Sequence, residues 1–286
     1  MRILKLALLA ALIIGSLLAL GASGQHVIWG LLLNPAADSH GMMLNGTFNP
    51  LSVVKVRQVI NRGINRQDIL TAYSGSGVSG IMYTPVSMVW CCSDTYFGNA
   101  MGLSPTGIGN EYFCQAIHDG MLTLGAEVNA GGHYTYNGEI VELTFVVRTD
   151  TNDGRNFAAE KIADLLELAG LVVTRKYVSG STWTQTLWGK DPELGEWHLA
   201  LTGWVDQDQY TVLEMIRQYY APSSMQLPGC CPHPNVKWWE YENIDIEADL
   251  ANAAATTNRV DYIKFLEEAV LEGLRESFQI AIGGFD

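Results

Sequence analysis

The chain has 286 residues, of which 48% are hydrophobic and 16% are charged, a composition that gives a folded protein enough core for one or two domains. Its formal net charge of −13 and its pI near 4.8 argue against nucleic acid as a partner, because a nucleic-acid-binding surface needs clustered Lys and Arg. They fit an acidic surface that attracts cations or basic ligands.

The N-terminus has the pattern of a secretory signal. A basic start precedes an apolar run of fifteen residues from Leu6 to Leu20, and residues 22–24, Ala-Ser-Gly, then offer a cleavage site. This run is short for a membrane-spanning helix, which needs about 20 residues, although a retained N-terminal anchor is the alternative. We therefore expect a signal peptide over residues 1–24 and a secreted domain over residues 25–286, in the periplasm or at the extracellular cell surface.

The first regular elements are expected after the signal. Residues 27–33 read as a strand, and residues 54–70 read as one amphipathic helix that Ser52 is placed to cap. One apolar face of this helix is formed by Val56, Val59, Ile60 and Ile64. Its other faces carry Arg57, Arg62 and Arg66. Residues 72–134 are rich in Gly, Ser and aromatic residues, so we expect a long irregular, insertion-like region that contains one short helix over 111–124.

Strands and helices alternate in the second half of the chain. Strands are expected over 142–147, 171–178 and 198–204, and helical segments over 157–169 and 183–188. Gly170 is placed to end the longer of these helices in the left-handed conformation. This alternation predicts an α/β fold with a parallel or mixed sheet covered by helices.

Several of these segments resemble the family 5 extracellular solute-binding proteins, which serve peptide and nickel ABC transporters. Residues 54–70, VKVRQVINRGINRQDIL, are similar to the family's "VRQAINYAIDREAI" helix, and residues 142–209 are similar to its second-lobe module, with the same order of elements. Residues 238–255 and 258–278 resemble the two segments that follow. The resemblance implies a mixed sheet flanked by helices, as in the second lobe of a two-lobed periplasmic-binding-protein (type II) fold. Family members are longer and begin with a first lobe, so we expect the second lobe only.

The same resemblance points to a ligand site in the turn after residues 198–204. In peptide-binding relatives, an Asp of the "GW..D" turn pairs with the α-ammonium group of the ligand. The family places this Asp three residues after the Trp, whereas here Asp206 and Asp208 lie two and four residues after Trp204, and both remain candidates. Trp204 is the candidate aromatic contact, and Trp183 is expected in the core. An ordinary solvated acidic turn is the alternative.

Five cysteines are disulfide candidates in an oxidising compartment, and their odd number leaves one over. They are Cys91, Cys92, Cys114, Cys230 and Cys231. Neighbouring cysteines rarely bond to each other, so the doublets are expected to pair with each other or with Cys114. Cys114 with His118, and the Cys-Cys-Pro-His run at 230–233, raise a metal site as an alternative. No paired C-x-x-C spacing occurs, and we expect no metal.

The sequence contains no nucleophile elbow, phosphate loop, H-E-x-x-H or dinucleotide fingerprint, so we expect neither an enzyme nor a cofactor. The resemblance implies an exported solute-binding module of a peptide or nickel ABC import system. Its expected partners are an oligopeptide or small cationic ligand, ABC permease subunits and a separately encoded first lobe. The alternative is a structural or interaction protein of the cell envelope that is built on the same fold and crosslinked through its cysteines.

Overall fold

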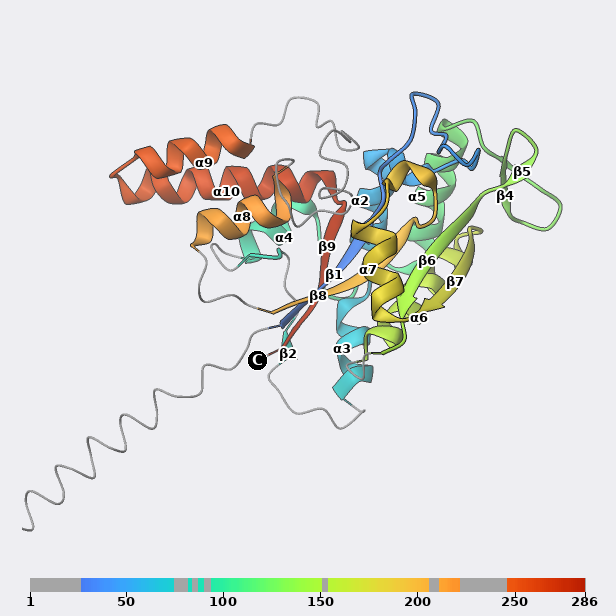
Figure 1. Ribbon diagram of the computed structural model, residues 1–286, viewed down its shortest axis with the longest axis horizontal. Coiled ribbons are helices and arrows are strands. Elements are labelled where there is room, and N and C mark those ends of the chain that lie inside the picture. Colours follow the sequence, from blue (N-terminus) through green and yellow to red (C-terminus); the bar gives the residue numbers. More distant parts are fainter. Residues whose placement is uncertain are drawn as a thin grey trace, which may run out of the picture.

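The computed structural model of the chain describes residues 27–74, 82–83, 87–89, 94–150, 154–205, 211–221 and 246–285. Within these residues, the main sheet has six strands in the order β2-β9-β1-β8-β6-β7 (Figure 1). Their bounds are β1 Val27–Leu33, β2 Met82–Tyr83, β6 Glu142–Arg148, β7 Val172–Val178, β8 Leu199–Val205 and β9 Gln279–Phe285. A second, small sheet consists of β3 (Glu127–Val128), β4 (Tyr134–Tyr136) and β5 (Glu139–Ile140).

The main sheet is mixed. β6 pairs in parallel with both β7 and β8, whereas β1 runs antiparallel to β8 on one side and to β9 on the other. The carboxyl ends of β6, β7, β8 and β9 therefore all lie at one edge of the sheet. The α/β class and the mixed sheet flanked by helices are confirmed.

Helices cover both faces of this sheet because alternate residues of its strands point in opposite directions. Trp29, Leu31 and Leu33 of β1 enter one core, and Ile28 and Leu32 enter two smaller ones. The first core is shared with α2 (Val54–Gly63), α3 (Arg66–Ser74), α5 (Asn110–Thr123) and α6 (Arg155–Leu168). The others are shared with α4 (Asp94–Met101), α7 (Gly180–Trp188), α8 (Val212–Tyr220), α9 (Ile246–Ala255) and α10 (Arg259–Glu276).

The prediction of one helix over residues 54–70 was wrong, because two helices occupy this segment. α2 ends at Gly63, Ile64 is extended (φ −65°, ψ 120°), and α3 starts at Arg66. The Oδ1 atom of Asn65 accepts a hydrogen bond from the Asp68 amide at 2.9 Å, so Asn65 caps the new helix. Ser52 does not cap α2: the residue before the helix is Val53, and the Ser52 hydroxyl donates to the Asn49 carbonyl instead.

Two arginines of this segment are buried, which helical spacing alone did not indicate. Arg57 is 4% exposed and Arg66 is 3% exposed, and both reach the C-terminal part of the chain. Arg57 donates to the Glu276 carbonyl at 2.7 Å, and Arg66 donates to the Ala281 carbonyl at 2.8 Å. Both helices are thus tied by hydrogen bonds to α10 and β9.

The other predicted elements are found with small shifts of their ends. α6 begins two residues earlier than predicted, at Arg155, and Gly170 follows its end with φ +90°, as expected. The described part of the region 72–134 contains α4 and α5, and α5 confirms the helix expected over 111–124. Trp183 is buried, as expected. Among the helices of the described residues, none is long and apolar enough to cross a bilayer.

Candidate ligand-binding site

Ligands bind outside the carboxyl ends of the strands in open α/β sheets, and the predicted site follows the carboxyl end of β8 in the sequence. The backbone of Trp204 pairs with Ile28 near the end of β8, and the acidic turn follows directly in the sequence. The structure therefore places the last residues of β8 at this edge, beside the amino end of β1. Asp206, Asp208 and the side chain of Trp204 lie outside what the structure describes, so their roles stay predictions.

An ion pair stands at the end of β6. The Arg148 guanidinium contacts the Asp150 carboxylate, with Nε to Oδ1 at 2.5 Å, and both side chains are partly exposed. The other oxygen of Asp150 accepts a hydrogen bond from the Gly180 amide, the first residue of α7, at 3.1 Å. The hydrogen bond from Arg148 is the main cause that holds the pKa of Asp150 below its ordinary value, and the Gly180 amide adds to it. This edge thus presents a fixed carboxylate and a fixed guanidinium.

A second guanidinium lies over β8. A Cβ atom on Gly203 would come within 2.8 Å of Nη1 of Arg155, so the Arg155 side chain packs directly against the β8 backbone. Arg155 is the first residue of α6, and Gly154 before it has φ +79°. Gly203 pairs with Trp29 of the neighbouring strand β1. The ring of Trp29 meets that of Tyr73 edge-on, with 5.0 Å between the ring centres. Arg155 therefore marks the point where α6, β8 and β1 meet.

Sequence reasoning missed both arginines. The predicted strand ends at residue 147 and the predicted helix begins at residue 157, so Arg148 and Arg155 both fall between predicted elements. The available signal was a basic residue near each predicted boundary: Arg148 directly follows the strand, and Arg155 stands two residues before the predicted start of the helix. That these positions meet at one edge can be predicted only when the parallel pairing of β6 and β8 is known.

Cys114 and His118, the pair that raised a metal site as an alternative, have separate partners. Cys114 forms no disulfide, and its thiol lies 3.6 Å from the Leu168 carbonyl. His118, on the same helix, has Nδ1 at 3.3 Å from the Tyr134 hydroxyl. Within the residues that the structure describes, no three His, Cys, Asp or Glu side chains gather as metal ligands would. The other four cysteines, Cys91, Cys92, Cys230 and Cys231, and the segment 1–24 lie outside the described residues.

The fold resembles that of known binding proteins. NikZ of Campylobacter jejuni, in complex with Ni(L-His), matches 94% of this chain with a TM-score of 0.65 at 13% identity, and 49% of its own length is covered. The periplasmic oligopeptide-binding protein of Thermotoga maritima, bound to mannohexaose, matches 91% of this chain with a TM-score of 0.65 at 17% identity, over 44% of its length. AppA of Bacillus subtilis, an oligopeptide-binding protein in complex with a nonapeptide, gives a TM-score of 0.62 at 14% identity, over 91% of this chain and 45% of that one.

No protein-family model matches the sequence, and a search of curated proteins gives no significant match. From the structural matches alone, the chain has the fold of part of a substrate-binding protein, and it spans a little under half the length of these neighbours. At these identities the likeness concerns the fold.

Proposed function

We propose that this protein is an exported solute-binding module of a peptide or nickel ABC import system, and that it corresponds to the second lobe of the two-lobed fold. The observation that carries the proposal is the match of at least 91% of the chain to binding proteins, two of them oligopeptide-binding proteins, whose structures hold a nickel complex, mannohexaose and a nonapeptide. The neighbours are binding proteins, and the proposed role is likewise binding and not catalysis.

The proposed ligand site is the carboxyl edge of the sheet. The acidic turn that carries Asp206 and Asp208 follows β8 there, and the Arg148–Asp150 pair stands at the end of β6. A peptide presents an α-ammonium group, which a carboxylate of the turn would accept in charge-assisted hydrogen bonds. Trp204 would contact an apolar side chain of the ligand. The negative charge of the protein, −13, favours the approach of a cationic ligand.

A single lobe leaves one side of its ligand in water, so the affinity of the isolated chain should be modest. The proposed partners are a separately encoded first lobe, which would close over the ligand by a hinge motion, and the permease subunits of the transporter. Export through the N-terminal signal would bring the protein to the periplasm or the cell surface.

Calorimetry of the full chain against a peptide mixture and against nickel, with and without a first-lobe partner, tests this function. Asp206→Asn or Asp208→Asn should weaken peptide binding at least about tenfold without changing the fold, because a charged hydrogen bond is lost. Asp261→Asn, on the exposed side of α10, is the control and should bind as the unmodified protein does. Absence of binding to either ligand in both settings would refute the transport function and favour the envelope-structural alternative.

A further inference from the structure

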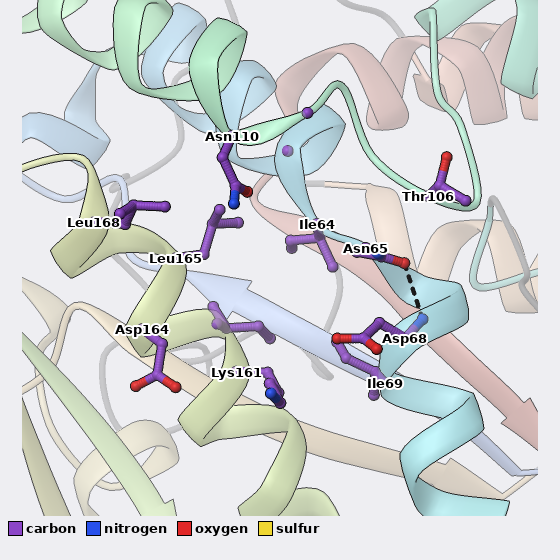
Figure 2. A pocket seen from close by; sticks show the side chains of 13 residues that line it. Ile64, Asn65, Asp68, Ile69, Thr106, Asn110, Lys161, Asp164, Leu165 and Leu168 are labelled. Carbon is purple, nitrogen blue, oxygen red and sulfur yellow. Dashed lines mark hydrogen bonds between the residues drawn. The ribbon is translucent and has the colours of Figure 1, made fainter.

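A pocket of about 410 Å³ lies away from the carboxyl edge, between the α2–α3 junction, the loop that precedes α5, and α6 (Figure 2). Its floor is aliphatic, and Ile64, Ile69 and Ile162 are each at most 2% exposed. Leu165 and Leu168 continue the apolar surface along α6. Volume and lining are those of a small-molecule site, which combines an apolar body with a few convergent polar groups.

Opposite charges stand on facing walls of this pocket. Asp68 belongs to α3 and Lys161 to α6, and both side chains are exposed. Within the described residues neither has an ion-pair partner: the Lys161 ammonium lies 5.4 Å from the centre of the Phe157 ring, and the Asp68 carboxylate makes no ion pair. Asp164, a third charged residue of the lining, is already paired with Arg175 at 2.9 Å. The pocket therefore offers one anion and one cation to a ligand.

Asn110 adds a neutral polar group. It is the first residue of α5, and Figure 2 shows its amide directed into the pocket, opposite Lys161. The Asp164 carboxylate points away from the space that the other side chains surround. An amide can both donate and accept, so Asn110 fits either end of a ligand that carries two charges.

The walls are held in place before any ligand arrives. The buried Arg66 guanidinium donates to the Asn61 carbonyl at 3.1 Å and to Oδ1 of Asn61 at 2.6 Å, which fixes the junction of α2 and α3. The backbone N–H of Gln67 donates to the Pro105 carbonyl at 2.9 Å, which ties the loop before α5 to α3. A Cβ on Gly107, whose φ is +74°, would lie 2.5 Å from the Gly63 carbonyl oxygen, so the loop packs tightly on the junction. A preformed site loses little conformational entropy on binding.

From this arrangement we propose a second ligand site, for a free α-amino acid with an apolar side chain. The α-ammonium group of the ligand pairs with Asp68, its carboxylate pairs with Lys161, and its side chain packs on Leu165 and Leu168. A ligand with a single charge would leave one wall unpaired, and a ligand without an apolar part would leave Leu165 and Leu168 in water. The site is independent of the carboxyl edge, since none of the residues argued for that edge lines it.

Titration of the full chain with leucine, followed by calorimetry or NMR, tests this proposal. Asp68→Asn and Lys161→Gln should each weaken leucine binding about tenfold, because each removes one charge-assisted contact. Asn110→Trp should abolish binding by filling the pocket. The matched controls Asp261→Asn and Lys264→Gln, both on α10, should leave the affinity unchanged.

The two charged contacts are separated by using ligands that lack one end. N-acetylleucine has no ammonium group, so Asp68→Asn should not weaken its binding further, and leucinamide has no carboxylate, so Lys161→Gln should not weaken its binding further. Glycine, which lacks the apolar side chain, should bind more weakly than leucine. The proposal is overturned if leucine does not bind at millimolar concentration, or if the pocket variants leave its affinity intact. It is also overturned if only Asp206→Asn or Asp208→Asn weakens leucine binding, which would place the amino acid at the carboxyl edge and support the function proposed above.

Discussion

Arg57 and Glu276 form an ion pair across 219 residues of sequence, with Nη2 of Arg57 at 2.9 Å from Oε2 of Glu276. The same guanidinium donates to the carbonyl oxygens of Glu276, Leu51 and Ser52, at 2.7, 2.8 and 3.1 Å. Burial raises the pKa of the Glu276 carboxyl, and Arg57 lowers it in turn. Three of these four hydrogen bonds go to backbone oxygens, so Arg57 uses all three of its guanidinium nitrogens to link the end of α10 to α2 and the turn before it.

The two partners should therefore differ in what their removal costs. Arg57→Met should lower the free energy of unfolding by about 3 kcal/mol, because it leaves backbone carbonyls and a carboxylate without their donor. Glu276→Gln should cost only about 1 kcal/mol, since the amide oxygen still accepts a hydrogen bond. Urea unfolding measures both. Lys264→Met breaks the exposed pair of Lys264 with Glu268, also on α10, and as a control it should change stability by less than about 0.5 kcal/mol. Equal losses in the two variants of the buried pair would contradict this division.

His198 should make the protein less stable in acid. It is 1% exposed, and burial lowers its pKa from near 6.5 to about 4. The unfolded chain therefore takes up the proton first as the pH falls, and the free energy of unfolding should decrease between about pH 6.5 and about pH 4 by up to roughly 3 kcal/mol. Below that range the contribution should level off, because His198 is then protonated in both states. Urea unfolding at a series of pH values measures the slope.

A substitution isolates this residue from the other titrating groups. The Thr144 amide donates to Nδ1 of His198 at 3.0 Å, and the side-chain oxygen of an asparagine can take over as acceptor. His198→Asn should therefore flatten the pH profile, even though its smaller side chain lowers stability overall. His40, whose side chain is 79% exposed, gives the control, and His40→Asn should keep the full slope. An unchanged slope in His198→Asn would assign the acid sensitivity to other groups.

Local pattern was sufficient for most of the sheet and its covering helices. The apolar run 27–33 is β1 with the expected bounds, and Gly170 ends α6 in the left-handed conformation. The break between α2 and α3 could not be predicted from helical spacing, because Ile64 has the spacing of the apolar face and is in fact buried. What ends α2 is the cap by Asn65 and the reach of Arg66 to β9, a contact with a strand 215 residues away.

The end of the strand that precedes the candidate site was predictable, but the described side chains beside that strand end were not. The order of the predicted elements put Trp204 at the end of the third strand in the alternating segment 142–204. The pairing of the Trp204 backbone with Ile28, near the end of β8, agrees with this. Arg155 and Arg148 join that edge only through the pairing of β6 with β8 and the packing of α6, which no local window contains. The pocket between α3 and α6 depends likewise on two helices that are more than 80 residues apart in the sequence.

The cysteines should divide into a bridged set and a free thiol. Cys114 forms no disulfide in the structure, so the doublets Cys91-Cys92 and Cys230-Cys231 are now expected to pair with each other. Peptide mapping without reductant should find a bridge between the two doublets and Cys114 as a free thiol. Such a bridge closes a long loop and should contribute about 2–4 kcal/mol, which reductant would remove. A bridge that includes Cys114 would contradict the assignment, and five free thiols would revive the metal alternative.

Gly154 should be the least replaceable glycine at the carboxyl edge. It has φ +79°, and a Cβ there would lie 2.1 Å from Cδ2 of Tyr73. Gly46 has φ +82° with nothing within 4 Å of its Cβ, so it shares the backbone strain without the collision. Gly46→Ala should cost about 1 kcal/mol, the strain of a side chain at positive φ. Gly154→Ala should cost about 2 kcal/mol more, because the Tyr73 ring must move.

A double-mutant cycle separates the two causes. Tyr73→Leu removes the ring that the new methyl group meets, so in that background Gly154→Ala should cost little more than Gly46→Ala does. Tyr73 also meets Trp29 edge-on, and Trp29 pairs with Gly203 beneath Arg155, so the displaced ring in Gly154→Ala should also weaken peptide binding at the proposed site. Urea unfolding measures the first effect and calorimetry the second. If Gly154→Ala costs the same in both backgrounds, the collision with Tyr73 is not the cause, and the backbone angle alone accounts for the loss.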